Sequence, residues 1–313
     1  MEMAETAATP SERQGAASRA GNFSFLLQVS RPGLWATTTL FYLMPLGRAI
    51  HLDSQRFWVG LVYILFPLGF LLYGVNDMVD TETDRLNPRK GTFLFGSRGA
   101  LEQLSALRWK IAAVQAPFLA AFYFLVGSGI LLWLLTLLVA VTLYNAPPFA
   151  WKGRPPFDVL IQASYLLIFV LSSWLNQIPQ LPWQTFLFGA MFAMHSHIFG
   201  EVLDLEPDRA AGRTTTATLI GRLSSKFLIA TFLAIESLLI FWNFRDLAIT
   251  GFLALGSLWF VFDAGVLWKS NNYSPFEMRL FMLGWNSVAI IGSFWNWHNG
   301  SLTRVLQLSG LSK

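Results

Sequence analysis

The chain has 313 residues and a formal net charge of +4, and 54% of its residues are hydrophobic while only 13% are charged. Soluble domains carry roughly twice that charged fraction, so the composition excludes an ordinary soluble domain and predicts a polytopic membrane protein. The absence of cysteine excludes disulfides, thiolate metal ligands and a cysteine nucleophile.

The first 22 residues are small and polar and lack the apolar core of a signal peptide, so they are predicted to form a disordered tail. Residues 23–313 are predicted to form a single all-α transmembrane domain. A bilayer core about 30 Å thick requires roughly 20 apolar residues per helix. Nine such segments are predicted, at residues 31–50, 57–75, 109–126, 129–145, 158–175, 183–200, 226–243, 249–267 and 279–297.

Basic residues are distributed unevenly over the two ends of these segments. Of the 22 Lys and Arg residues, 17 lie in the amino-terminal tail or around the loops that follow the even-numbered segments, and five lie on the other side. Because loops rich in Lys and Arg stay in the cytoplasm, this bias predicts a cytoplasmic N-terminus and a C-terminus on the opposite side. The same bias explains the net positive charge without a nucleic-acid partner.

Two groups of acidic residues lie on the predicted cytoplasmic side. The first occurs in NDMVDTETD (76–84), where Asn76, Asp80 and Asp84 are four residues apart and share a face if the helix continues past the membrane edge. Asp77 is one step off that face, and Glu82 is expected to face solvent. The second group occurs in HSHIFGEVLDLEPD (195–208), where spacings of four, three and four place these residues on one helix face: His197, Glu201, Asp204 and Asp208.

Two acidic faces at one membrane surface repel each other unless positive charge lies between them. Oxygen ligands with one Asn carbonyl among them suit Mg²⁺, which binds through a few carboxylates together with substrate phosphates. The alternative is a pair of solvated loops balanced by nearby arginines. The matching four-residue spacing of two clusters on one side favours a diphosphate site that opens toward the cytoplasm.

A proline-flanked loop, YNAPPFAWKGRPPFD (144–158), presents Lys152 and Arg154 on the same side. Proline stiffens the connection, so these two cations are expected at fixed positions where they contact phosphate oxygens. The alternative is that they are the basic residues expected in any cytoplasmic loop.

Taken together, NDMVDTETD (76–84), APPFAWKGRPPFD (146–158) and DLEPDRAAGRTTTA (204–217) resemble the motifs of the UbiA superfamily of intramembrane prenyltransferases. The resemblance extends over nearly the whole chain from Arg31 onward. It implies nine transmembrane helices around a central cavity, short cytoplasmic cap helices, and an isoprenyl diphosphate held by two Mg²⁺ ions. The implied reaction is ionisation of the diphosphate to an allylic carbocation and transfer of the isoprenyl group to a lipophilic acceptor, aromatic or polyene, inside the membrane.

The resemblance also assigns site residues by position. The implied metal ligands are Asn76, Asp77, Asp80, Asp84, Asp204 and Asp208. The implied diphosphate contacts are Lys152, Arg154, Arg85, Arg89, Lys90 and Arg213. Catalysis is expected to depend most on Asp80, Asp204, Asp208 and Lys152.

The segment after the first motif, RLNPRKGTFLFGSRGALEQL (85–104), departs from the RPLPSG pattern of many superfamily members. It is more similar to the carotenoid-elongating branch, which includes lycopene elongases. Its glycines are expected to form a lid over the site.

Several polar residues are candidates for the cavity that binds the acceptor: Glu201, His197, Tyr144 and Asn145. Glu236 and Asp263 lie inside predicted spans, where an ionisable group either lines a cavity or bonds two helices together.

Two other functions fit parts of the sequence. A terpene cyclase on the same scaffold would use the same acidic motifs without an acceptor. A transporter or cation channel would use the acids as gates, but both acidic groups lie on one side and no internal repeat is evident.

Overall fold

The computed structural model describes residues 23–81, 84, 87, 89–99 and 101–305. The expected tail 1–22, and Glu82 and Arg85 of the first motif region, lie outside the described residues. The helices, in chain order, are η1 (Pro32–Leu34), α2 (Trp35–Leu43), α3 (Gln55–Tyr63), the π-helical turn η2 (Ile64–Leu68), α4 (Gly69–Val79), α6 (Leu101–Ser105), α7 (Leu107–Val126), α8 (Gly129–Asn145), η3 (Trp151–Gly153), α9 (Phe157–Leu160), η4 (Ile161–Leu166), α10 (Leu167–Asn176), α11 (Trp183–Ala210), α12 (Thr216–Phe244), α13 (Leu247–Gly265) and α14 (Pro275–Asn299).

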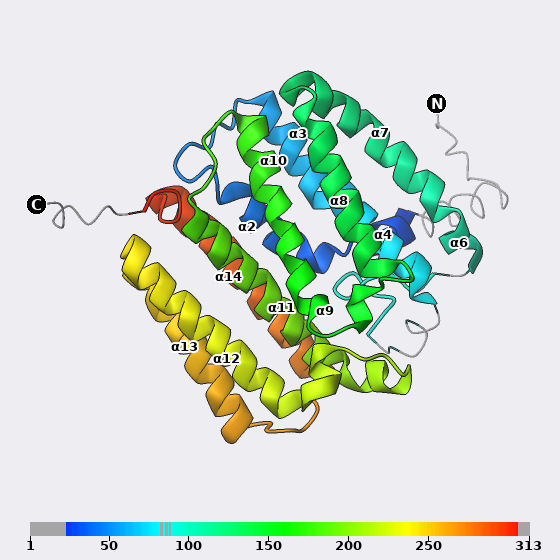
Figure 1. Ribbon diagram of the computed structural model, residues 1–313, viewed down its shortest axis with the longest axis vertical. Coiled ribbons are helices and arrows are strands. Elements are labelled where there is room, and N and C mark those ends of the chain that lie inside the picture. Colours follow the sequence, from blue (N-terminus) through cyan, green and yellow to red (C-terminus); the bar gives the residue numbers. More distant parts are fainter. Residues whose placement is uncertain (1–22, 82–83, 85–86, 88, 100, 306–313) are drawn as a thin grey trace, which may run out of the picture.

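The predicted all-α class is confirmed. Within the described ranges the chain forms no strand beyond an isolated bridge between Thr92 and Gly96. Helix α12 packs between α11 and α13, while α14 packs on α2, and η4 packs on α11. Figure 1 shows α12 and α13 side by side at one edge of the bundle and α7 at another, with α11 and α14 between them.

In the part of the chain that the structure describes, six helical stretches are long and apolar enough to cross a membrane: 55–79, 103–126, 157–176, 183–210, 216–244 and 247–265. Helix α8 is apolar but shorter, at 17 residues. Leucines, phenylalanines and tryptophans are exposed along α8, α13 and α14, as expected where helices face lipid. The chain is therefore a multi-pass integral membrane protein, and the predicted number of nine spans stays a prediction.

Several of the long stretches are interrupted, and two of these interruptions have a clear local cause. Pro67 lies in the π-helical turn between α3 and α4, where Gln115 of α7 donates to the Pro67 carbonyl at 2.6 Å and Tyr63 donates to Gln115 at 3.0 Å. These bonds satisfy backbone that the irregular turn would leave unpaired in lipid. In α12, Gly221 adopts φ +81°, which separates a first turn from the rest of the helix.

The loops at one end of the bundle are tied together by side chains. Arg56 donates to the carbonyl of Leu125 at 2.9 Å, and Thr185 donates to the carbonyl of Leu302 at 2.6 Å. The two acidic motifs lie at the opposite end, where α4 and α11 terminate.

Candidate active site

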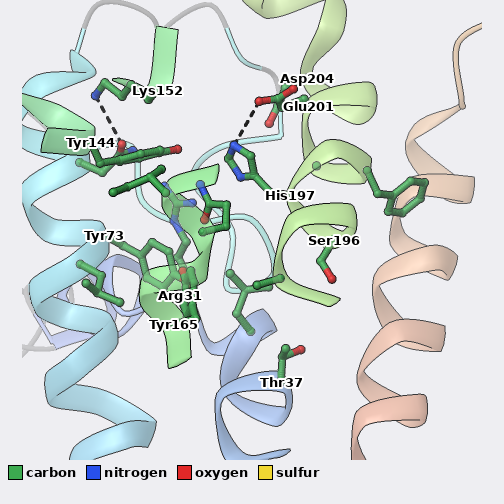
Figure 2. A pocket seen from close by; sticks show the side chains of 18 of the residues that line it. Arg31, Thr37, Tyr73, Tyr144, Lys152, Tyr165, Ser196, His197, Glu201 and Asp204 are labelled. Atoms are coloured by element: carbon green, nitrogen blue, oxygen red, sulfur yellow. Dashed lines mark hydrogen bonds and ion pairs between the residues drawn. The ribbon is translucent and has the colours of Figure 1, made fainter. Parts of the chain in front are cut away.

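A cavity of about 360 Å³ opens at the end of the bundle where α4 and α11 terminate. It is lined by η1, α2, α4, α8, η3, η4, α10, α11, α14 and the segment 89–95, together with Arg31 and further residues between these helices. Figure 2 shows Lys152, Glu201 and Asp204 toward one end of the cavity, Thr37 at the other, and His197 between them. The deeper walls are largely apolar and include Phe41, Leu72, Trp133, Phe192 and Trp285.

The second acidic motif lies on a single continuous helix, as the spacing predicts. Helix α11 runs for 28 residues, and its cavity side presents His197, Glu201, Asp204 and Asp208. The cavity follows α11 from Asp208 to Phe192, which at 1.5 Å per residue is a depth of about 24 Å.

The first motif is less regular than predicted. Helix α4 ends at Val79, and Asp80 at its C-cap has φ −91° and ψ 15°, so the expected uninterrupted helical face through Asp84 does not form. The amide of Asp84 nevertheless bonds to the carbonyl of Asp80 at 2.8 Å, and Asn76, Asp80 and Asp84 all line the cavity.

Asp80 joins the three sequence motifs. One of its oxygens accepts hydrogen bonds from Lys152 at 2.6 Å and from Arg213 at 2.7 Å. Lys152 sits in η3 of the proline-flanked loop and also donates to Asn145 at 3.2 Å and Asn76 at 3.4 Å. Burial lowers the pKa of Lys152, an effect that the carboxylate of Asp80 opposes.

The segment after the first motif supplies further cations. Lys90 pairs with Asp84 at 2.8 Å, and Arg89 pairs with Asp204, which also accepts from Asn87 at 2.7 Å. Burial raises the pKa of Asp84, while Lys90 opposes this shift. Arg89 and Lys90 line the cavity, and so do Leu94 and Phe95 beyond them, so this segment covers part of the mouth.

Two candidates from the sequence lie elsewhere. Asp77 is outside the cavity lining and is held by Arg31 at 3.3 Å, Lys90 at 3.1 Å and Ser97 at 2.5 Å. Arg154 is exposed and does not line the cavity. Their proposed roles as metal ligand and diphosphate contact stay predictions.

The candidates for the acceptor region lie beside the charged end of the cavity. The Nε2 atom of His197 is 3.1 Å from Oε1 of Glu201, and the rings of His197 and Tyr144 meet edge to face with centroids 6.2 Å apart. The amide of Ala217, in the first turn of α12, donates to the other Glu201 oxygen at 3.0 Å. Tyr144 and Asn145 both line the cavity.

Sequence reasoning missed a polar group on the cavity wall. The guanidinium of Arg31 lies 4.4 Å from the ring centre of Tyr73, whose hydroxyl is 2.8 Å from that of Tyr165. All three residues line the cavity. The only signal for Arg31 is its place at the start of the first span, and single tyrosines in apolar segments give no signal.

The two isolated acids inside spans bond helices together and do not line the cavity. Glu236 of α12 is 2.9 Å from Nδ1 of His195 on α11. Asp263 of α13 accepts from Lys226 of α12 at 2.7 Å and from Tyr273. The interhelical alternative is therefore the one the structure shows.

The donor set around the cavity fits a hard cation. Asn76, Asp80, Asp84, Asp204 and Asp208 offer only oxygen ligands, which Mg²⁺ prefers. Within the described ranges no three acids converge closely enough to enclose a metal ion unaided. Mg²⁺ commonly keeps waters and shares phosphate oxygens, so carboxylates on two sides of one cavity suit it.

The fold and this cavity together define a membrane-embedded helical protein with a charged site at one end of an apolar chamber. Comparison with known proteins gives the family. The sequence profile of the UbiA prenyltransferase family matches residues 34–286. The chain belongs to this family and is a prenyltransferase, as the sequence motifs predict.

Similar proteins include several named lycopene elongase/hydratase. The chain is 30% identical over 259 residues to a lycopene elongase/hydratase from Corynebacterium glutamicum, covering 80% of this chain and 86% of the relative. It is also 30% identical over 203 residues to a lycopene elongase/hydratase from Halobacterium salinarum, covering 64% and 72% respectively.

Solved structures share the fold. A UbiA homolog from Archaeoglobus fulgidus bound to DMAPP and Mg²⁺ matches with a TM-score of 0.66 at 21% identity, covering 88% of this chain and 99% of that chain. The same homolog bound to GPP and Mg²⁺ matches with a TM-score of 0.64 at 20% identity, covering 88% and 100%.

Proposed function

We propose that the protein transfers an isoprenyl group from an isoprenyl diphosphate to a polyene acceptor inside the membrane, with two Mg²⁺ ions. The observation that carries this proposal is the meeting of both acidic motifs, Lys152 and Arg213 at the charged end of one apolar cavity. The names of the relatives, lycopene elongase/hydratase, support the acceptor class.

The charged end would hold the diphosphate. Asn76, Asp80 and Asp84 on one side, and Asp204 and Asp208 on the other, would supply the metal ligands. Bound Mg²⁺ would neutralise the departing diphosphate. Lys152, Arg213, Arg89 and Lys90 would donate to phosphate oxygens that metal ions leave uncovered, because each already lies at the same mouth.

The apolar end would protect the allylic cation. Breaking the allylic C–O bond leaves a carbocation that water would trap, and the walls formed by Phe41, Leu72 and Phe192 exclude water. Aromatic ring faces can also stabilise a passing cation. The chemistry then requires an electron-rich double bond of the acceptor to approach from the deeper part of the cavity.

The deeper cavity favours an uncharged acceptor. The one cation described among its deeper lining residues, Arg31, pairs with Asp77 and stacks on Tyr73. An aromatic acid would need an unneutralised cation for its carboxylate, whereas a polyene needs only apolar surface. This charge balance supports the polyene over the aromatic acceptor.

We further propose that the charged end faces the cytoplasm, with the N-terminus on that side and the C-terminus opposite. The proposal rests on the excess of Lys and Arg around the loops at this end.

The test is reconstitution of purified protein in lipid vesicles with lycopene, dimethylallyl diphosphate and Mg²⁺. Diphosphate release coupled to a lycopene product heavier by one or two isoprenyl units is expected. Asp80→Ala and Asp208→Ala should each reduce turnover by about 100-fold or more, the scale expected when charge stabilisation at a leaving group is removed. Asp53→Ala, in an exposed loop, is the matched control.

Two results would contradict the proposal. Full activity of both cavity variants would reject the metal site. Diphosphate release without lycopene, with a cyclic hydrocarbon as the sole product, would instead identify a terpene cyclase.

A further inference from the structure

We propose that His197 is the base that removes the proton from the prenylated acceptor, and that Glu201 is the residue that positions it. The inference rests on the proposed function and adds the step that ends the reaction. It is carried by the contacts of these two side chains and by their depth in the cavity.

Glu201 is fixed by contacts to both of its oxygens. One oxygen is 3.1 Å from Nε2 of His197, and the other accepts from the amide of Ala217 at 3.0 Å. Ala217 lies in the first turn of α12, where backbone N–H groups favour a negative charge. The orientation of the Glu201 side chain is therefore set from outside the cavity.

Glu201 lies where it can stabilise a protonated His197. Its Oε1 atom is 3.1 Å from Nε2, so the carboxyl group favours the imidazolium that forms when His197 takes up a proton. The side chain of Glu201 is 6% exposed, whereas that of His197 is 21% exposed and lines the cavity. The imidazole is thus reachable from the cavity and has a buried carboxyl group beside it, as a base in this position requires.

His197 lies at the depth where the new bond would form. It is seven residues before Asp204 on the same helix, so it is about 10 Å deeper than that metal-site acid. Figure 2 shows its ring between the charged end and Tyr73, with Tyr144 on the facing side. The allylic carbon must leave the diphosphate in this direction to reach an acceptor in the apolar part.

The other ionisable groups near the site are less suited to accept a proton. The four aspartates of the diphosphate end, Asp80, Asp84, Asp204 and Asp208, each lie within ion-pair distance of Lys or Arg. The acidic groups that act on the imidazole are Glu201, Asp158 of α9 and Asp208 of α11, and the ring of Tyr144 on α8 meets it edge to face. Among the described lining residues, His197 is the one histidine.

Bond formation and proton loss need no reactant beyond the diphosphate, the acceptor and His197. The π pair of an acceptor double bond forms a carbon–carbon bond to the allylic cation, which moves the positive charge to the neighbouring acceptor carbon. The C–H pair beside that carbon forms a new double bond, and its proton goes to the imidazole of His197. The resulting imidazolium is neutralised by Glu201 and returns its proton to water at the mouth of the cavity.

The experiment compares His197→Gln and Glu201→Gln with wild-type protein, using dimethylallyl diphosphate, Mg²⁺ and lycopene in vesicles. His298→Gln, an exposed histidine at the far end of α14, is the matched control. Binding of geranyl diphosphate with Mg²⁺, followed by tryptophan fluorescence, establishes that each variant is folded and has an intact charged end.

His197→Gln should bind the diphosphate like wild type but form product 10- to 1,000-fold more slowly, within the usual range for loss of a general base. With lycopene deuterated at the carbon that loses the proton, the isotope effect on product formation should increase in this variant. Glu201→Gln should shift the acid limb of the pH–rate profile, and His197→Gln should abolish that limb.

The proposal is overturned if His197→Gln keeps the wild-type rate, isotope effect and pH limb, which would make the departing diphosphate the base. It is also overturned if only the KM for the diphosphate changes, which would make His197 a binding residue. Absence of any lycopene product with wild-type protein would instead reject the proposed function itself.

Discussion

Lys152 illustrates how a single buried cation can set the properties of the site. Its ammonium group has oxygen partners from Asp80, Asn145 and Asn76, and its side chain is only 8% exposed. Burial lowers its pKa because desolvation disfavours the charged form, and Asp80 restores part of the loss. Lys152 should therefore lose its proton at a lower pH than an ordinary lysine does.

Removal of this charge should weaken diphosphate binding. We expect Lys152→Met to raise the KM for the prenyl diphosphate about 10- to 100-fold, the scale of one or two charged hydrogen bonds. Steady-state kinetics at fixed Mg²⁺ would measure this, and a KM within twofold of wild type would contradict it.

The pH dependence follows from the direction of the shift. Raising the pH removes the Lys152 cation, so affinity for the diphosphate should fall on the alkaline side, starting below the ordinary lysine range. Lys152→Arg should move this limb to higher pH because guanidinium does not titrate there. KM measured against pH for both proteins would check this, and identical alkaline limbs would exclude Lys152 as the titrating group.

At the scale of elements, η1 anchors the segment that covers the cavity mouth. The amide of Gly33 donates to the carbonyl of Phe93 at 3.1 Å, while its own carbonyl accepts from Asn286 of α14 at 2.8 Å. A Cβ on Gly33 would overlap the backbone of Leu94, which also lines the cavity. Only glycine allows this close approach.

Gly33→Ala should therefore displace the segment 89–99 while the bundle stays folded. Because Arg89 and Lys90 belong to this segment, we expect a KM for the diphosphate raised about tenfold, equivalent to losing one charged contact. Gly251→Ala, a glycine of α13 with open space around it, should behave like wild type. Equal kinetics for the two variants would reject this role of Gly33.

Helices α12 and α13 are joined by a buried ion pair. Lys226 is fully buried, and its ammonium contacts Asp263 at 2.7 Å and the carbonyl of Lys269 at 2.9 Å. Tyr273 donates to the other Asp263 oxygen. These contacts attach the loop between α13 and α14 to helix α12.

Lys226→Met should destabilise the protein by about 3–5 kcal/mol because it leaves the Asp263 carboxylate buried with only Tyr273. The double variant Lys226→Met with Asp263→Leu should recover most of this loss. Thermal unfolding in one detergent would compare them, with the exposed Lys269→Met as control. A single variant as stable as wild type would show that the pair contributes no net stability.

For the whole molecule, the two ends of the bundle differ in function and should face different compartments. The cysteine-free chain permits a direct test, because one introduced cysteine is then the only thiol. Asp53→Cys lies in an exposed loop at the end opposite the cavity, and Lys269→Cys lies in an exposed turn near the charged end.

In intact cells, a membrane-impermeant maleimide should label the Asp53→Cys variant and leave the Lys269→Cys variant unlabelled until the cells are permeabilised. The reverse pattern would invert the proposed topology. Labelling of both in intact cells would indicate mixed insertion.

The sequence predicted which residues share a helix face where the signal is local. The spacing of His197, Glu201, Asp204 and Asp208 predicted one face of α11, and the structure places all four on the cavity wall. The same spacing rule was only partly right for the first motif, because α4 ends before Asp80. A helix end at a membrane edge depends on its partners as well as on its own residues.

Composition, apolar length and charge bias determined by themselves that this is an all-helical membrane protein, and the motifs indicated a prenyltransferase, because these properties follow from the chain's own solvation and periodicity. Only the tertiary structure decided which acids share the cavity. Asp80 meets Lys152 and Arg213 from positions 72 and 133 residues away, whereas its neighbour Asp77 turns to Arg31 and Ser97. Such pairings depend on how distant helices pack, and buried charges must find their partners there.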